Sequence, residues 1–205
     1  ATLKTFGVVL VMAIVMHWIW LCVLFVGTGL AQGRSPVMLI KNMLPAYFTA
    51  LGTMSSAATI PVALQASKRN GVSDGIANFT VPLCATIHLC GSTITLVTCA
   101  TAVMFLSEHL AIPGYGTMLP FIMMLGVIMI AAPGAPGGGV MSALGLLTSM
   151  LGFGEASIAL MIALYLAQDS FGTACNVTGD GVIALWADRF AQVGETTRSP
   201  ERDAA

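Results

Sequence analysis

Charge is scarce in this chain of 205 residues, because only 8% of them are Asp, Glu, Lys or Arg and 57% are hydrophobic. A soluble globular domain carries about 25% charged residues. The mean hydropathy is +0.89, and the stretch from 70 to 188 contains no Lys or Arg. This shortage argues against a soluble enzyme, a disordered chain and a small disulfide-held domain, and it indicates an integral membrane protein.

The sequence also lacks the motifs of several chemistries. No P-loop, nucleophile elbow or dinucleotide-binding glycine motif occurs, so we expect neither enzyme activity nor a cofactor. The net charge of -1 offers no basic surface for nucleic acid. The cysteines never have the Cys-x2-Cys spacing of a metal site, so we interpret them as small buried apolar groups. They are Cys22, Cys84, Cys90, Cys99 and Cys175.

The few cations predict an orientation in the membrane. Most of the eight Lys and Arg residues fall into three groups, at 34 to 41, at 68 to 69 and from 189 onward. Such groups stay on the cytoplasmic side, whereas the loops at 108 to 116 and 154 to 156 carry none and are expected outside. The C-terminus is therefore predicted to be cytoplasmic, with a polar, disordered tail at 193–205.

Three apolar segments are long enough to cross a bilayer, which takes about 20 residues. They are 6–31, 79–106 and 157–186. The first follows Lys4, as the core of a signal peptide would. It is nevertheless too long for such a core, which has about 7 to 15 residues. We therefore expect a retained helix.

Two further segments are interrupted. Residues 42–67 have a polar centre at Thr53 to Thr59 and cationic groups at both ends, which predicts a re-entrant hairpin that turns at the serines. An ordinary span with small packing residues is the alternative. Residues 119–151 are broken by the Pro- and Gly-rich run 131 to 139, which predicts a second hairpin that enters from outside. Two broken segments of this kind point to a transporter binding site.

The last span carries a polar face. Its polar residues are separated by four, four, three and four positions, which puts them on one side of a helix. They are Tyr165, Asp169, Thr173, Asn176 and Asp180. A carboxylate in a bilayer costs about 2.5–3.5 kcal/mol, and no Lys or Arg is available nearby as a partner. A mobile cation or a substrate ammonium is the expected counter-charge; the alternative is a protonated Asp, which would suit proton coupling.

Four motifs follow one another along the chain: Ser55 to Pro61 (SSAATIP), Pro82 to Ser92 (PLCATIHLCGS), Pro136 to Gly139 (PGGG) and Asn176 to Asp180 (NVTGD). In their order and spacing they resemble the C-terminal core of the dicarboxylate/amino acid:cation symporter family, which includes the glutamate transporters. The resemblance covers about residues 34 to 190. It implies an all-α elevator-type transporter of the plasma (cell inner) membrane, homotrimeric at full length. Residues 1–192 would form its core of two re-entrant hairpins and three spanning helices.

Family members carry five more spans before this region, and the chain starts at Ala1, so we expect a fragment or a truncated product. The resemblance also implies roles for individual residues. Asp169 would hold the substrate's amino group, Thr173 and Asn176 its carboxylate region, and residues 135 to 139 would be the gate. The implied substrate contacts are Ser55, Ser56, Ser92, Ala135, Gly139, Asp169, Thr173 and Asn176.

Sodium ions are implied as the coupling ions. One site would combine Asp180 with backbone oxygens near Cys84, His88 and Asn176. A second would use Thr86 and the Leu89 carbonyl, which would face the second tip. The implied ligands are therefore Cys84, Thr86, His88, Leu89, Asn176 and Asp180.

The chain departs from the family pattern at three positions. Members that carry acidic substrates have an Arg where this chain has Gly172, and His88 and Cys90 replace an Asn and an Asp. The missing Arg makes aspartate and glutamate poor candidates, and the pattern is closest to the sodium:serine/threonine branch. We predict a symporter that moves a small neutral amino acid such as serine, threonine or alanine with sodium. The alternatives are a sodium- or proton-coupled symporter of dicarboxylates or acidic amino acids, and a non-transporting half-transporter subunit.

Overall fold

The computed structural model describes residues 2–198, and the side chains of residues 6–192. In this part of the chain every regular element is an α-helix, as the sequence predicts. The helices are α1 Thr2–Gln32, α2 Pro36–Thr53, α3 Ser56–Arg69, α4 Asp74–Ile87, α5 Cys90–Leu106, α6 Tyr115–Met129, α7 Gly138–Leu151, α8 Glu155–Leu166 and α9 Asp169–Arg198.

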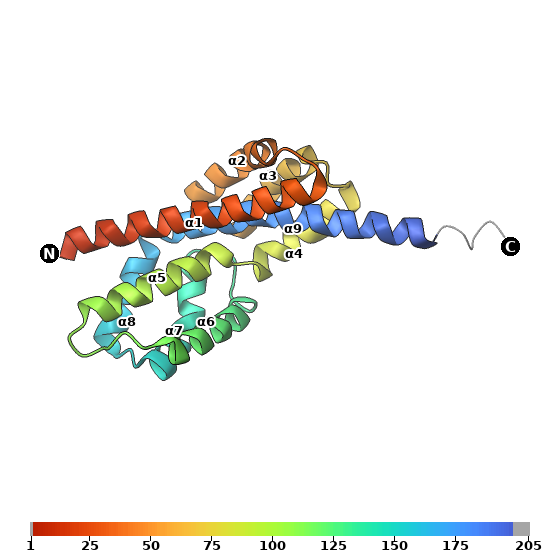
Figure 1. Cartoon of the computed structure of the whole chain (residues 1–205). Helices are drawn as coiled ribbons and strands as arrows, with labels where there is room; N and C mark the ends of the chain where they lie inside the picture. Colours follow the sequence, from red (N-terminus) through yellow and green to blue (C-terminus); the bar gives the residue numbers. More distant parts are fainter. Residues whose placement is uncertain (1, 199–205) are drawn as a thin grey trace.

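Two long helices, α1 and α9, lie side by side along the molecule (Figure 1). The indole Nε1 of Trp186 on α9 donates to Thr28 Oγ1 on α1 at 3.0 Å. Helices α2 and α3 lie on one side of this pair, and α5 to α8 lie on the other (Figure 1). Because α9 contacts α1 to α5, it forms the centre of the fold.

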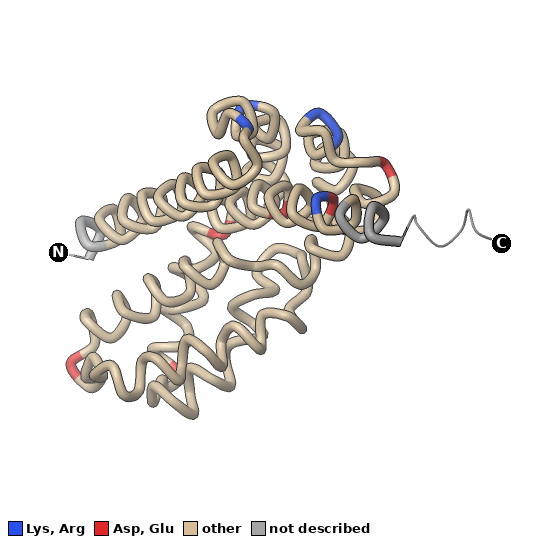
Figure 2. Tube along the Cα trace, turned by 45° about the vertical axis from the view of Figure 1, so that its right-hand side comes forward, with Lys and Arg blue, Asp and Glu red and all other residues tan. Residues whose placement is uncertain are grey.

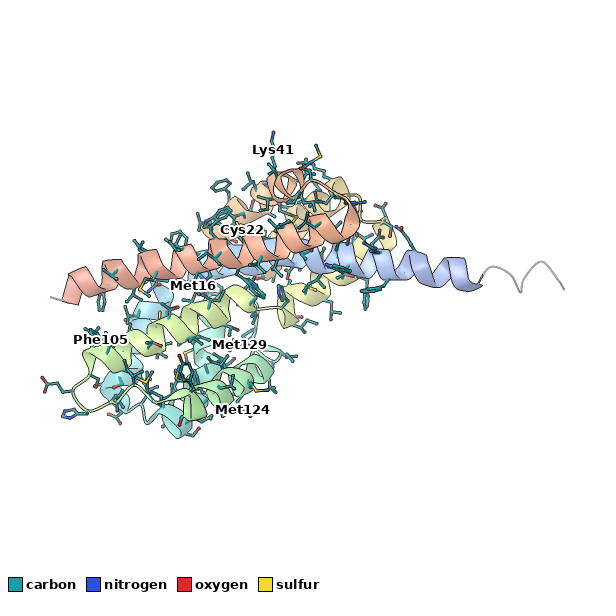
Figure 3. All side chains as sticks on the ribbon, in the orientation of Figure 1. Met16, Cys22, Lys41, Phe105, Met124 and Met129 are labelled. Carbon is teal, nitrogen blue, oxygen red and sulfur yellow. The ribbon has the colours of Figure 1, made fainter. Side chains whose placement is uncertain are left out.

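The outer face of α1 is apolar, as a membrane-spanning helix requires. Met16 is 48% exposed and Cys22 is exposed as well; both belong to the row of side chains along α1 (Figure 3). Among the described residues, two helical segments are long and apolar enough to cross a membrane, 6–32 and 74–106, and a third counts if α8 and α9 form one bent span.

The first hairpin consists of α2 and α3, with its turn at Met54 and Ser55. Met54 has a φ of 52°, which closes α2 in the left-handed region. The Ser55 hydroxyl accepts a hydrogen bond from Ala58 N at 3.2 Å and so caps α3. The sequence predicts a turn at the serines, and the turn between α2 and α3 lies there. That this hairpin enters a membrane remains a prediction.

The second interrupted segment consists of α6 and α7, which have 15 and 14 residues. Each is shorter than the roughly 20 residues that cross a bilayer. The connecting segment ends at Gly137, whose φ of 75° suits glycine. A glycine-rich tip between two short apolar helices is therefore the structural outcome of the run at 131 to 139.

Two helix breaks were not predicted. The segment 79–106 is interrupted at His88 and Leu89, between α4 and α5, and the last span is bent by 58° between α8 and α9. No Pro or Gly stands at either break, so the chain gives no local signal. Both breaks are instead stabilised by contacts from distant residues, described below.

Within residues 6–192 the cations gather at one end of the molecule. Figure 2 shows Lys and Arg gathered around α2, α3 and the C-terminal part of α9, while the lower helices carry only acidic residues. Helix α9 continues to Arg198, which lies within the segment 193–205 that the sequence predicts as a tail. The remainder of the predicted tail, 199–205, lies outside the described residues.

Candidate functional site

The tips of both hairpins meet α5, α8 and α9 at a small pocket. It encloses about 10 Å³, which is room for about one water molecule. Its lining consists of Ser56, Leu89, Ser92, Pro133, Gly134, Ala135, Gly139, Tyr165, Asp169, Thr173 and Asn176. Seven of the eight predicted substrate contacts line this pocket; the eighth, Ser55, lies next to it on the first tip.

Asp169 is the acidic group of the pocket. It is the first residue of α9, immediately after the bend, and it is 4% exposed. Its Oδ2 accepts a hydrogen bond of 2.7 Å from the backbone N–H of Gly137, the residue that caps α7. The second tip is thereby tied to the only carboxylate that lines the pocket.

Asn176 holds the break between α4 and α5. Its Oδ1 accepts from Gly91 N at 2.7 Å and from Ser92 N at 3.2 Å, and its Nδ2 donates to Ser92 Oγ at 2.8 Å. The first N–H groups of a helix have no partner within that helix, and here a side chain of α9 supplies one. Asn176 therefore fixes the start of α5 and places Ser92 in the pocket.

The two tips are joined directly across the pocket. Ser55 Oγ donates to the Gly134 carbonyl at 3.1 Å, and Ala57 N donates to the same oxygen at 3.4 Å. A Cβ at Gly134 would lie 2.4 Å from the Ala85 carbonyl oxygen, so only glycine fits between α4 and the first tip.

Tyr165 is a pocket residue to which the sequence assigned no role. Its side chain is 1% exposed and its hydroxyl interacts with Ser92 and Asp169. A Cβ at Gly139 would lie 2.5 Å from Tyr165 Oη, so the glycine makes room for the phenol. The signal was present, because Tyr165 belongs to the polar face one turn before Asp169.

Asp180 lies deeper along α9 and is 1% exposed. Its Oδ1 is 2.8 Å from His88 Nδ1, in the break between α4 and α5. A Cβ at Gly179 would lie 2.8 Å from His88 Cε1, so that glycine gives the imidazole its place. The expectation was that the His88 backbone would face Asp180, but the side chain makes the contact.

The other expected sodium ligands are arranged differently. Cys84 is buried, and its carbonyl accepts from His88 N at 2.9 Å. Thr86 is exposed and donates to the Leu83 carbonyl at 2.8 Å. The Leu89 carbonyl accepts from both the N–H and the hydroxyl of Thr93, each at 2.9 Å. Both groups thus make local hydrogen bonds here, and a second cation site formed by Thr86 and the Leu89 carbonyl stays a prediction.

Gly172 faces α5 and not the pocket. A Cβ there would lie 2.9 Å from Thr95 Oγ1 and 3.4 Å from the Gly91 backbone. The pocket lining contains no Lys, Arg or His. His17 approaches the same contact from α1, where its Nε2 is 3.0 Å from the Gly91 carbonyl oxygen. This region is helix packing, and residues 70–188 supply no Lys or Arg that could pair there with a second carboxylate.

A comparison with known families identifies the chain. The model of the sodium:dicarboxylate symporter family matches residues 1–190. The chain belongs to this family. This confirms the resemblance seen in the motifs, and the members that it matches are transporters and not enzymes. The branch within the family is not established by the match.

Individual relatives of this symporter family point the same way. The chain is 28% identical over 179 residues to an excitatory amino acid transporter of Caenorhabditis elegans. This alignment covers 81% of the chain and 34% of that protein. Identity is 32% over 155 positions to excitatory amino acid transporter 1 of Rattus norvegicus, with 75% and 28% covered. It is 27% over 166 positions to neutral amino acid transporter B(0) of Oryctolagus cuniculus, with 78% and 30% covered. The chain thus spans about a third or less of these relatives.

Proposed function

We propose that this chain forms the substrate-binding core of a sodium-coupled symporter for a small neutral amino acid, such as serine, threonine or alanine. The observation that carries this proposal is Asp169, a buried carboxylate in a pocket without a cationic side chain. A buried charge needs a partner, and a substrate ammonium provides one. The names of the relatives, which include excitatory and neutral amino acid transporters, support amino acids as the substrate class.

The remaining pocket groups suit the other end of an amino acid. Hydroxyls of Ser56, Ser92 and Thr173 and the amide of Asn176 line the pocket together. They offer hydrogen bonds to a carboxylate or a side-chain hydroxyl, and none carries a charge that would favour a second carboxylate. A neutral substrate is therefore the better match.

Substrate entry requires the second tip to move. The space of about 10 Å³ is far below the volume of an amino acid. An ammonium at Asp169 would share the carboxylate with the Gly137 N–H of the second tip, so the substrate and the tip would contact the same group. This supports the role of residues 135 to 139 as the gate of an elevator-type transporter.

Sodium would be cargo that moves together with the amino acid. Asp180 has one carboxylate oxygen held by His88, and its other oxygen remains as a hard ligand for a small cation. Backbone oxygens of α4 and α9 near Cys84 and Asn176 complete the proposed site. The family's name supports sodium coupling.

The proposed orientation of the chain in the membrane follows from the positions of its Lys and Arg residues. The Lys and Arg residues near α2, α3 and the end of α9 (Figure 2) would lie in the cytoplasm under the positive-inside rule. The tip of the first hairpin would then enter from the cytoplasm, and α9 would end there. We expect a plasma-membrane protein whose homotrimeric assembly, if present, depends on other segments.

The decisive experiment measures thermal unfolding of the purified chain with each of the common amino acids, in sodium chloride and in choline chloride. We expect serine, threonine or alanine to raise the unfolding temperature in sodium alone. Stabilisation by aspartate without any response to serine would overturn the neutral substrate. Equal stabilisation in choline would overturn sodium coupling.

A second candidate is symport of an acidic amino acid or dicarboxylate. It is favoured by identities of 28% and 32% to excitatory amino acid transporters. The packing of Gly172 against Thr95 and Gly91 counts against it, because no cation reaches the pocket from that position. The same measurement with aspartate and succinate separates the two candidates.

A further inference from the structure

A second cavity lies away from the substrate pocket, at the cationic end of the molecule. It has a volume of about 290 Å³ and is bounded by the α1–α2 loop, the first turns of α2 and the end of α3. Its lining consists of Arg34, Ser35, Met38, Leu39, Asn42, Arg69 and Asn70. Two arginines therefore line one cavity, and no Asp or Glu is among its lining residues.

The two arginines differ in what holds them. Arg34 donates to the backbone carbonyl of Asn70 and lies against Gly71, so its guanidinium is fixed in place. Arg69 is exposed, and no hydrogen bond or ion pair of its guanidinium occurs within residues 6–192. The nearby acid Asp74 is paired with Lys68 at 3.1 Å. Two like charges in one cavity favour an anion that neutralises both.

The polar surroundings suit a phosphate group. Ser35 caps the N-terminus of α2, where its hydroxyl accepts from Met38 N at 3.4 Å. The Asn42 amide donates to Asn70 Oδ1 at 2.8 Å and stands on the cavity wall. Guanidinium groups bind phosphate oxygens in pairs, and the two arginines supply such pairs from different elements.

The apolar surroundings distinguish a lipid from a soluble anion. Leu30, Val37 and Met38 are 76%, 75% and 64% exposed, and Met38 also lines the cavity. A soluble phosphate would leave these side chains uncovered, whereas the acyl chains of a phospholipid would cover them. Basic pockets between helices on the cytoplasmic side are suited to anionic lipid headgroups.

We propose that this cavity binds the phosphate of an anionic phospholipid between Arg34 and Arg69. The site is separate from the substrate pocket and does not require amino acid binding. It depends on the proposed function only for the placement of this end at the cytoplasmic surface of a membrane.

The test uses the full chain in a neutral detergent, with thermal unfolding followed during titration with dioleoyl phosphatidylglycerol, dioleoyl phosphatidylcholine or inorganic phosphate. We expect stabilisation by phosphatidylglycerol at concentrations at least tenfold lower than by phosphatidylcholine, and little effect of phosphate. Arg69→Gln should raise the phosphatidylglycerol concentration for half-maximal stabilisation at least tenfold, because it removes one of the two arginines that would bind the phosphate. The fold should be unaffected, because the Arg69 guanidinium has no partner within residues 6–192. Arg69→Lys, which keeps the charge but not the planar fork, should lie in between.

Lys41→Gln is the matched control. This change removes the same charge from the same helix pair, yet Lys41 projects away from the body (Figure 3) and does not line the cavity. Its response to phosphatidylglycerol should stay within twofold of the parent chain. Equal losses in Lys41→Gln and Arg69→Gln would overturn the site, as would equal responses to the two lipids. Stabilisation by inorganic phosphate equal to that by phosphatidylglycerol would overturn the assignment to a lipid.

The outcome is separable from the proposed transport function. Arg69→Gln should leave stabilisation by serine and sodium unchanged, since Arg69 is not in the substrate pocket. Loss of the amino acid response in the parent chain, with the lipid response intact, would count against the transport proposal alone. Loss of the lipid response with the serine response intact would count against the lipid site alone.

Discussion

His88 Nδ1 lies 2.8 Å from Asp180 Oδ1, and the imidazole reaches this carboxylate because residue 179 is a glycine. The pair joins the break between α4 and α5 to the middle of α9. One of the two oxygens that a coupling cation would use is therefore already engaged by a side chain of the protein itself.

Replacing His88 by Ala should destabilise the chain in the absence of sodium. Removing His88 leaves the buried Asp180 carboxylate without this hydrogen bond, which costs about 1–3 kcal/mol. Sodium should restore more stability to this variant than to the parent chain, since it gains access to Oδ1. Thermal unfolding in sodium chloride and choline chloride measures both effects.

Asp180→Asn provides the control for this pair. The double variant His88→Ala/Asp180→Asn should lose less stability than the sum of the single changes, by about 0.5–3 kcal/mol, as expected of residues in contact. Strict additivity, together with an unchanged sodium response of His88→Ala, would show that the pair has no part in cation binding.

Asp169→Asn should weaken amino acid binding by about 10- to 150-fold. The change removes a charge-assisted hydrogen bond to the substrate ammonium, which is worth about 1.5–3 kcal/mol. Because an amide oxygen can still accept from Gly137 N, the fold should survive. Asp74→Asn, at an acid 82% exposed and far from the pocket, is the matched control in the same binding titration. Equal affinities of both variants for serine would refute the role of Asp169.

Gly139→Ala should close the pocket to substrate, because the new Cβ would lie 2.5 Å from Tyr165 Oη. Tyr165→Phe removes that oxygen and leaves Cζ as the nearest atom, at 3.3 Å. We therefore expect Tyr165→Phe to restore part of the serine binding lost in Gly139→Ala. Isothermal titration of the single and double variants tests this, and the absence of any recovery would place the clash elsewhere.

Ser55→Ala should loosen the connection between the two tips. The change removes a helix cap, which costs about 0.5–2 kcal/mol, and also the hydrogen bond to the Gly134 carbonyl. Ser35→Ala removes a cap of the same kind on α2, with no bond to the second tip. Proteolysis or spin-label measurements at the tip should therefore report greater opening in Ser55→Ala than in Ser35→Ala. Identical opening would mean that the Ser55 bond does not hold the tips together.

The polar face at 165 to 180 shows which parts of the site can be predicted from the sequence. Its spacing predicts one continuous helical face, and four of its five residues line the pocket, while Asp180 lies deeper along α9 against His88. Tyr165, however, belongs to α8, and the bend after it is held by distant residues: Asp169 Oδ2 accepts from Gly137 N at 2.7 Å, and Gln168 Nε2 donates to Cys99 Sγ at 3.6 Å. Neither Ala167 nor Gln168 is a helix breaker in itself, so the bend is a consequence of packing.

The serines of the first hairpin and the His88 break illustrate the same difference. Ser55 is a helix cap whose partner is three residues away, and such a local signal can be recognised in a sequence. The start of α5 is capped by Asn176, more than eighty residues along the chain. The contact of His88 with Asp180 likewise depends on how α4 and α9 pack. Chemistry at these positions could be expected from residue types, but the pairing could not.

The cap that Asn176 places on α5 has a mechanical consequence. One side chain both closes a helix and borders the substrate, so α5 cannot shift along α9 without breaking the three hydrogen bonds that shape the pocket. We expect α5 and α9 to move together as one rigid unit. The gate proposed at 135 to 139 would then move relative to this unit, and the elevator-type proposal expects the unit to carry its cargo as a whole.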